Sequence, residues 1–132
     1  MDQPNIILVS KDKVKQVKSA ILLAFSSDPF IRWLFPNPND YVEKFSIWID
    51  EFISIGMPAE GVYADEGVSG SAIWLPPGIN LDGGVLGSTF TAIPTDRVET
   101  ALKLFDIFGT FHPREDHWYL SFLGVDPLNH GR

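Results

Sequence analysis

Hydrophobic residues in the first third of the chain predict a strand, a helix and an irregular segment. Residues 5–9 form a short β-rich run that ends at Ser10, and Ser10 is also placed to cap a helix. Apolar residues then recur with a 3.6-residue period over positions 14–25, which predicts an amphipathic helix. Residues 26–39 are dense in proline and large aromatic residues, so we expect a short helix or turn between proline-fixed loops.

A second helical stripe follows over residues 42–53. Asp40 and Glu43 have the spacing of a capping box at its start. Gly56 and Pro58 end it, so this segment is the second long helix.

The middle of the chain predicts a hairpin and a loop. Residues 60–64 and 68–75 have strand patterns, and the Asp-Glu-Gly sequence at positions 65–67 between them is a hairpin turn signal. Residues 79–93 are rich in glycine and have no clear period, so we expect a loop there.

The last two predicted elements are a helix and a strand. Thr95 can cap a helix whose apolar positions recur over residues 98–108. Residues 117–125 are apolar on both faces apart from His117 and Ser121, which is the pattern of a central strand covered on both sides.

Composition narrows the class of protein. The 132 residues are 45% hydrophobic and 20% charged, which suits one packed domain and gives no case for disorder. A net charge of −7 has the wrong sign for following phosphates, so no nucleic-acid partner is expected. The chain has no cysteine, which excludes a disulfide framework and thiolate chemistry. Its apolar runs are too short to cross a bilayer, so we expect a soluble, cytoplasmic protein without a membrane partner.

Familiar catalytic motifs fail on spacing. The sequence has no Gly-x-Ser-x-Gly elbow, no P-loop and no His-Glu-x-x-His zinc motif. His112, Glu115, Asp116 and His117 could in principle bind a metal, but acidic residues in a loop before a strand are usually solvated. We therefore assign no metal site.

The end of the chain is a strand followed by a proline-containing loop and a glycine: Leu123-Gly124-Val125-Asp126-Pro127-Leu128-Asn129-His130-Gly131-Arg132. This order resembles motif A of the GCN5-related N-acetyltransferase (GNAT) family. In that motif a strand ending in Leu-x-Val leads through a proline-containing loop to Gln/Arg-x-x-Gly-x-Gly at the head of a helix. His130 takes the Gln/Arg position.

Two earlier segments resemble the puromycin N-acetyltransferase-like branch of that family. Residues 24–36 read Ala-Phe-x-x-Asp-Pro-x-x-Arg-Trp-Leu-Phe-Pro, and residues 72–78 read Ala-Ile-Trp-Leu-Pro-Pro-Gly. With the His-Pro pair at 112–113 and the His-Trp pair at 117–118, the resemblance covers nearly the whole chain.

The resemblance implies a fold and an activity. The fold is α+β (mixed α/β), the amino-terminal part of the acyl-CoA N-acyltransferase fold, with a mostly antiparallel central sheet and flanking helices, incomplete after the fourth strand. Residues 1–132 would then be a single truncated domain. The activity is transfer of an acetyl group from the co-substrate acetyl-CoA to a small-molecule amine, which attacks the thioester directly.

The strand and loop of motif A would bind acetyl-CoA. A strand that splays from its neighbour leaves backbone groups that can pair with the two amides of a pantetheine arm. Three residues would supply those groups: Leu123, Gly124 and Val125. A cradle of amides for the pyrophosphate would begin at His130, Gly131 and Arg132, at the head of a helix.

Catalytic candidates lie on the same strand. Alternation along the strand puts His117, Tyr119, Ser121 and Leu123 on one face, and in the resembling family this part of the strand faces the amine pocket. His117 is the candidate base because imidazole titrates near neutral pH, while Tyr119 and Ser121 would orient a water or the amine. A backbone N–H of the strand would stabilise the oxyanion. The alternative for His117 is a hydrogen-bonded histidine at the start of a strand.

Phe30, Trp33 and Phe35 are candidate walls of the acceptor pocket, as the corresponding segment is in the resembling family. Packing in the core explains these rings equally well. The acceptor amine stays open, because specificity depends on pocket shape and not on fold.

The motif stops at Arg132, before either glycine of Gly-x-Gly. We therefore expect the 132-residue form to bind acetyl-CoA weakly or not at all. Without further cover, the last strand would keep an apolar edge that favours self-association as a homodimer. The alternative function is a non-catalytic GNAT-like module that self-associates or binds a partner through that strand.

Overall fold

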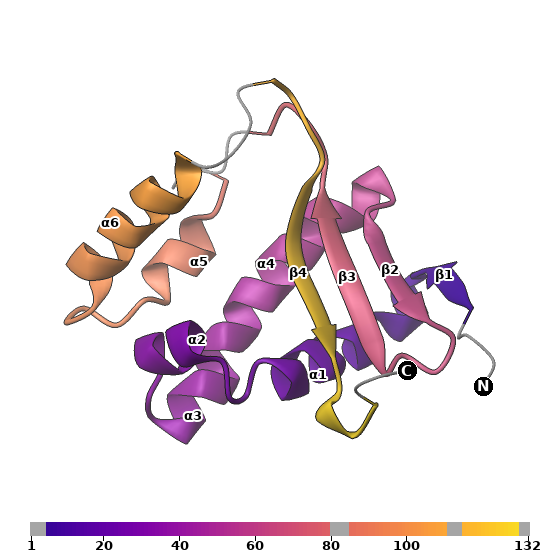
Figure 1. The fold of residues 1–132 in the computed structure, drawn as a ribbon, viewed down its shortest axis with the longest axis horizontal. Coiled ribbons are helices and arrows are strands. Elements are labelled where there is room, and N and C mark those ends of the chain that lie inside the picture. The colour runs from indigo at the N-terminus through magenta and orange to yellow at the C-terminus, as the bar shows by residue number, and fades with distance from the viewer. Residues whose placement is uncertain (1–4, 80–84, 111–114, 130–132) are drawn as a thin grey trace.

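Four antiparallel strands form one sheet, in the order β1-β2-β3-β4, in the computed structural model, which describes residues 5–79, 85–110 and 115–129. The strands are β1 (Ile6–Leu8), β2 (Val62–Asp65), β3 (Gly70–Leu75) and β4 (Tyr119–Val125). Consecutive strands are neighbours, so β1 and β4 are the two edges among the described residues (Figure 1). The predicted antiparallel sheet with flanking helices is confirmed.

The helices fall into two groups. Figure 1 shows α1 and α4 running behind the sheet, whereas α5 and α6 lie together beyond β4. The helices are α1 (Val14–Ala24), α2 (Pro29–Leu34), α3 (Pro38–Asp40), a π-helical turn at Tyr41–Phe45, α4 (Ser46–Gly56), α5 (Gly87–Thr91) and α6 (Val98–Gly109), with 3-10 turns at Lys11–Lys13, Met57–Ala59 and Pro127–Asn129. Over the described ranges, none of the helices has the length and apolar character needed to span a membrane.

The hydrophobic core lies between the sheet and the helices α1 and α4. Strand β3 alternates, with Ile73 and Leu75 buried on the helix side. Helix α1 contributes Val17, Ala20 and Ile21 to the same core, and α4 contributes five buried residues. The two predicted helical stripes are therefore confirmed, because their apolar faces meet one side of the sheet.

The second long helical run begins earlier than predicted. The Asn37 side chain accepts hydrogen bonds from the amides of Asn39 (2.8 Å) and Asp40 (3.2 Å), so α3 starts at Pro38. The capping box of Asp40 and Glu43 is therefore wrong, since both residues lie inside the helical run. An asparagine followed by proline was the stronger start signal.

Two other predicted caps do not form. The Ser10 hydroxyl donates to the carboxylate of Asp12 and makes no cap to a backbone amide. Thr95 lies in a turn closed by the Arg97 amide, which donates to the Pro94 carbonyl at 2.9 Å. Helix α6 therefore begins only at Val98, with Arg97 in the capping position.

Helix α5 lies inside the segment 79–93 that the sequence predicts as a loop. Its first turn is capped from another element, because the Glu51 carboxylate of α4 accepts hydrogen bonds from the amides of Ser88 (3.1 Å) and Thr89 (2.9 Å). A cap that comes from a distant part of the sequence leaves no local signal, which is why the helix was missed.

Strand β4 is covered on one face only, which corrects the prediction of a doubly covered strand. Phe122 and Gly124 are buried against the helices, whereas Leu123 is 63% and Val125 36% exposed on the outer face. The strand is an edge of the described sheet, so its apolar alternation does not mean cover on both faces. The apolar edge that the sequence predicts is present among the described residues.

One glycine and one turn shape the sheet locally. A Cβ added at Gly124 would lie only 2.6 Å from the Cβ of Ala24, so helix α1 and β4 approach closely because this residue has no side chain. In the turn between β2 and β3, Asp65 accepts hydrogen bonds from the Gly70 amide and the Ser69 hydroxyl, both at 2.8 Å. Partial burial acts to raise the pKa of Asp65, but these hydrogen bonds outweigh it and hold the pKa below its ordinary value.

Candidate functional site

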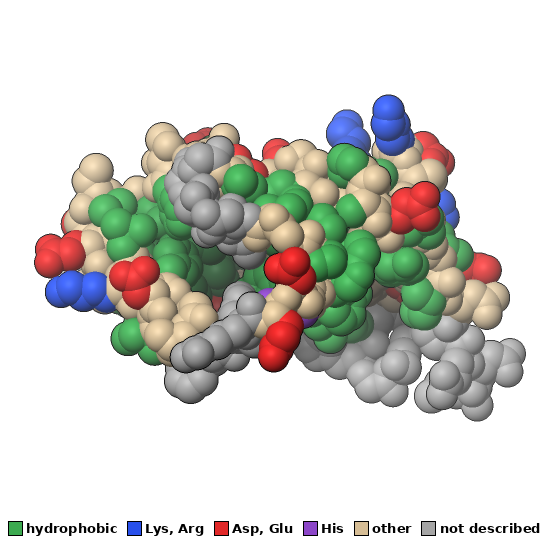
Figure 2. Space-filling view, turned by 90° about the horizontal axis from the view of Figure 1, so that it is seen from above, with side chains coloured by type: hydrophobic (Ala, Val, Ile, Leu, Met, Phe, Trp, Pro, Cys, Tyr) green, Lys and Arg blue, Asp and Glu red, His purple; other side chains and the backbone are tan. Residues whose placement is uncertain are grey.

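A cavity of about 830 Å³ lies between β4, the helices α1, α2 and α4, and the α5–α6 pair. Small-molecule sites span about 300–1,000 Å³, so this volume suits a ligand of that size. Nine of the described lining residues are aromatic: Phe25, Phe30, Trp48, Phe52, Phe90, Phe105, Phe108, Tyr119 and Phe122. Figure 2 shows a hollow in this part of the surface with hydrophobic side chains inside it and acidic side chains and a histidine at its edge.

A β-bulge interrupts β4 where it borders the cavity. Ile73 of β3 pairs with Phe122, but the next residue, Trp74, pairs with Leu120. Ser121 is therefore the extra residue of the bulge and has no opposite partner on β3. Its hydroxyl donates to the Ile73 carbonyl at 2.8 Å, which holds the bulged segment against the neighbouring strand.

The bulge changes which residues share a face. Tyr119 pairs with the buried Leu75, so Tyr119 lies on the helix side of the sheet, together with the cavity. Leu123 pairs with Ala72 on the outer face. The prediction that Leu123 and Tyr119 lie on one face is therefore wrong, because the extra residue shifts the alternation by one position.

His117 lies on the cavity wall with one ring nitrogen in a hydrogen bond. Its Nδ1 is 3.0 Å from the backbone carbonyl oxygen of Glu115. A carbonyl can only accept, so this bond requires the proton on Nδ1 and places the lone pair on Nε2. The ring is thus in the tautomer that can take up a proton at Nε2. The same hydrogen bond also fits the alternative role of His117, a histidine that is hydrogen-bonded at the start of a strand and has no catalytic role.

Tyr119 and Ser121 complete the polar wall that β4 contributes. Burial raises the pKa of the Tyr119 phenol above its ordinary value, so the hydroxyl stays protonated at neutral pH. Tyr119 is therefore suited to donate a hydrogen bond and unsuited to accept a proton. The structure brings His117, Tyr119 and Ser121 together on one cavity.

The charged groups on the described cavity wall are all acidic. Asp28, Glu115 and Asp116 line it, and no lysine or arginine does among the described residues. One oxygen of Asp28 accepts a hydrogen bond from the Ile31 amide at 2.9 Å and caps α2. The wall therefore presents a negative field, which favours a cationic ligand.

The three predicted acceptor residues have different positions. Phe30 lines the cavity and stacks on Trp33, with ring centroids 6.3 Å apart. Trp33 lies behind that wall, and the Arg97 guanidinium packs 4.8 Å above its ring centroid. Phe35 is fully buried in the core, 5.7 Å from the ring of Trp48. Of the three, Phe30 alone faces the cavity.

Sequence reasoning missed the residues that α4 and α6 give to this site. Trp48 and Phe52 line the cavity although the pattern assigns them only to the core stripe of α4. Phe105 and Phe108 line it from α6, one helical turn apart. A helical stripe looks the same whether it faces a core or a ligand, so the sequence has no signal that distinguishes these residues from core residues.

Of the residues predicted to bind acetyl-CoA, those on β4 lie within the described part of the chain. Leu123 and Val125 are exposed on β4, and no other described strand pairs with the edge of β4 that faces away from β3. An extended arm with two amides could pair with that edge as a further strand would. His130, Gly131 and Arg132 lie outside the described residues, as does His112. Within the described ranges, no group of three or more His, Cys, Asp and Glu residues could hold a metal.

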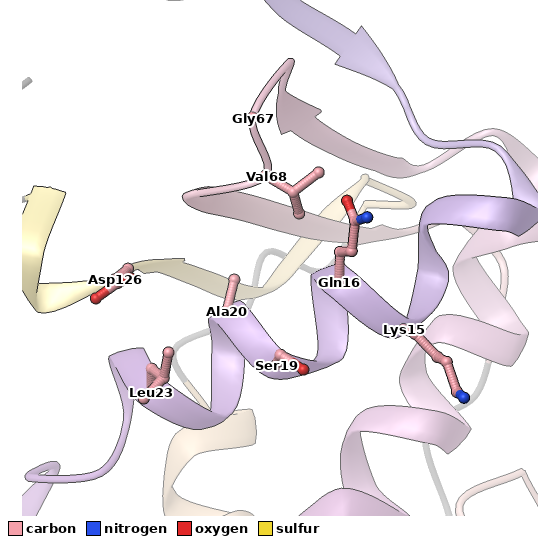
Figure 3. A pocket seen from close by; sticks show the side chains of 8 residues that line it. All are labelled: Lys15, Gln16, Ser19, Ala20, Leu23, Gly67, Val68 and Asp126. Carbon is pink, nitrogen blue, oxygen red and sulfur yellow. The ribbon is translucent and has the colours of Figure 1, made fainter.

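A second hollow, of about 290 Å³, lies between α1 and the β2–β3 turn (Figure 3). It is lined by Lys15, Gln16, Ser19, Ala20, Leu23, Gly67, Val68 and Asp126. Its described wall has no aromatic ring and none of the predicted site residues. In Figure 3 the Lys15 side chain points away from Asp126, so the two charges do not converge on one ligand.

Comparison with solved structures gives an informative likeness to an acetyltransferase structure. No family model matches the chain. A crystal structure from Corynebacterium glutamicum, described as histone acetyltransferase HPA2 and related acetyltransferase, superposes with a TM-score of 0.62 at 21% sequence identity. The match covers 98% of this chain and 64% of that chain, so this chain spans less than two thirds of the neighbour's length. The described residues, whose helices pack against an antiparallel sheet, therefore share the fold of that solved structure.

Proposed function

We propose that this chain is an acetyl-CoA-dependent N-acetyltransferase that acts on a small-molecule amine bound in the 830 Å³ cavity. The observation that carries the proposal is His117, whose Nδ1 is held by the Glu115 carbonyl and which lies on an acidic, aromatic cavity beside the bulged strand. The fold shared with a solved acetyltransferase supports the reaction class.

The chain's own residues would prepare the amine. Asp28, Glu115 and Asp116 attract it as an ammonium ion, which must lose a proton before it can attack. Nε2 of His117 takes that proton, directly or through a water, and the neutral amine then attacks the carbonyl carbon of the thioester. As the N–C bond forms and the C–S bond breaks, the nitrogen gives up its second proton and the departing coenzyme A thiolate takes up a proton. The Tyr119 hydroxyl, protonated at neutral pH, orients the amine or a water by donating a hydrogen bond.

Strand β4 would hold the acetyl donor. Acetyl-CoA supplies the activated acetyl group as a thioester. No described strand lies beside the edge of β4 that faces away from β3, so backbone groups near Leu123 could pair with the pantetheine amides. A backbone N–H at the bulge would stabilise negative charge that develops on the carbonyl oxygen of the acetyl group.

The test is thiol release from acetyl-CoA in the presence of small amines, measured both on this chain and on a form extended past Arg132. A thiol reagent reports only the coenzyme, because the chain has no cysteine. We expect His117→Gln to lower kcat by about 10²-fold and to remove the limb of the pH profile near neutrality. Tyr119→Phe should lower the rate, whereas Tyr63→Phe, on the outer sheet face, should not. An unchanged pH profile in His117→Gln would exclude His117 as the base.

A second candidate function rests on the outer face of the sheet. Ile6, Leu8 and Leu123 are 67%, 45% and 63% exposed there, which is unusual for one sheet face. A non-catalytic module would use this face and the edge of β4 to pair with a second copy. Light scattering together with the thiol assay decides between acetyl transfer and the non-catalytic module. The module is favoured if the chain is a dimer, if Leu123→Asp converts it to a monomer, and if neither form releases thiol.

A further inference from the structure

We infer that the acceptor is an aryl-alkyl amine, a compound with an aromatic ring on a short chain that ends in a primary ammonium group. The inference rests on the proposed acetyl transfer and adds the substrate class. It follows from how the rings and the charges of the 830 Å³ cavity are divided among the surrounding elements.

The rings form two walls that meet at Trp48. On one side Phe30 packs edge to face with Phe105 (6.2 Å) and Phe108 (5.8 Å), which joins α2 to α6. On the other side Phe52 packs edge to face with Phe122 at 5.1 Å, which joins α4 to β4. Trp48 lies 5.9 Å from Phe105 and links the walls.

The wall on α6 is left uncovered by the protein. Phe108 lines the cavity and is 46% exposed, although it belongs to an aromatic cluster. Exposed ring surface next to a cavity is stabilised when an apolar ligand covers it. An aryl group between the two walls would make the same offset or edge-to-face contacts that the protein rings make with each other.

The charged side chains described on the wall favour a ligand that carries a cation. Glu115 and Asp116 precede His117 directly, so two carboxylates lie on the same segment as the candidate base. An ammonium group held there would place its nitrogen on the side of the cavity from which His117 comes. A ligand with a ring alone would make no ion pair with these carboxylates. An aliphatic diamine would leave the aromatic walls uncovered.

Binding without acetyl-CoA tests the inference separately from the reaction. Calorimetry would compare 2-phenylethylamine with 2-phenylethanol, which lacks the charge, and with 1,4-diaminobutane, which lacks the ring. We expect 2-phenylethylamine to bind about tenfold more tightly than either comparator, because only it meets both the rings and the acids. Equal or tighter binding of either comparator would overturn the inference.

Matched variants on α6 locate the binding site. Phe108→Ala should weaken 2-phenylethylamine binding by about tenfold, since it removes one wall. Ile107→Ala changes a neighbouring residue that is 52% exposed and does not line the cavity, so it should leave binding unchanged. The Glu115→Gln, Asp116→Asn double variant should weaken binding, whereas Asp106→Asn should not. Equal effects of Phe108→Ala and Ile107→Ala would overturn the inference.

Thiol release then separates this inference from the proposed function. Cavity binding of 2-phenylethylamine without any thiol release would refute acetyl transfer and leave the ligand class standing. Faster thiol release with 1,4-diaminobutane than with 2-phenylethylamine would refute the ligand class and leave acetyl transfer standing.

Discussion

Helices α1 and α6 have nearly the same length and the same kind of amphipathic sequence, but their apolar faces have different surroundings. Of the 11 residues of α1, Val17, Ala20 and Ile21 are buried against the sheet. Of the 12 residues of α6, Ala101 alone is buried, and Leu102, Ile107 and Phe108 are 43%, 52% and 46% exposed. An amphipathic pattern therefore predicts a helix with an apolar face, but not whether that face meets a core or a cavity.

The difference implies that stability comes from one region and ligand binding from the other. Residues between the sheet and α1 and α4 have no space to relax, because the core is close-packed. Residues on the cavity side of α6 face open volume. The variants below test this division, beginning with the largest expected effect.

Truncation of a phenylalanine should lower stability much more in the core than on the cavity wall of α6. Phe45 is fully buried between α1, β4 and Trp48, so Phe45→Ala should lower the free energy of unfolding by about 3–5 kcal/mol. Phe108→Ala should cost less than about 1 kcal/mol, because the side chain is half exposed. Urea denaturation measures both, and a loss of similar size in the two variants would contradict the division.

Glycine to alanine changes make the same comparison with one added methyl group. At Gly124 the new Cβ would meet the Ala24 Cβ at 2.6 Å, so Gly124→Ala should destabilise the fold by about 1–3 kcal/mol through overpacking. At Gly109, the last residue of α6, nothing lies within 4 Å of the new Cβ. Gly109→Ala should be neutral or stabilise the helix by up to about 1 kcal/mol. Thermal unfolding measures the stability of both variants. A larger loss of stability in Gly109→Ala than in Gly124→Ala would contradict the division.

The turn between β2 and β3, which contains Asp65, should contribute to the loss of stability in acid. Burial acts to raise the pKa of Asp65, but its hydrogen bonds with Gly70 and Ser69 lower the pKa overall. A folded-state pKa below the unfolded value stabilises the protein above the unfolded pKa of about 3.9, and this stability is lost as the pH falls through the folded pKa. Asp65→Asn should therefore reduce the loss of stability in acid.

Urea denaturation between about pH 2 and pH 6 would measure this effect. Asp106→Asn on the exposed side of α6 removes one charge without those hydrogen bonds and serves as the control. An Asp65→Asn variant with the pH dependence of the wild type would show that the turn contributes nothing to acid sensitivity.

Much of the fold follows from sequence patterns of the residues themselves. The stripes of α1 and α4 and the alternation of β3 are properties of consecutive residues, so they predict elements correctly. Helix α5 and the bulge at Ser121 depend on contacts between distant residues, with Glu51 in one case and the register with β3 in the other. Neither contact leaves a local pattern.

The sequence also predicts only part of the candidate site. His117, just before β4, and Tyr119 and Ser121, on β4, line one cavity as predicted candidates from one segment, although the predicted strand of residues 117–125 begins only at Tyr119. Leu123 does not join them, because the bulge between Ser121 and β3 turns it to the outer face. The walls from α4 and α6 were unpredictable, since a helical stripe looks the same whether it faces a core or a ligand.

Chemical-shift mapping with 2-phenylethylamine tests most directly whether the cavity beside β4 is the acceptor site. The amides of His117, Ser121, Phe105 and Phe108 should shift with a common dissociation constant, since these residues line one cavity. The amides of Lys15 and Val68, at the hollow in Figure 3, should stay in place. Shifts confined to that second hollow, or no saturable shift at the cavity, would contradict the assignment.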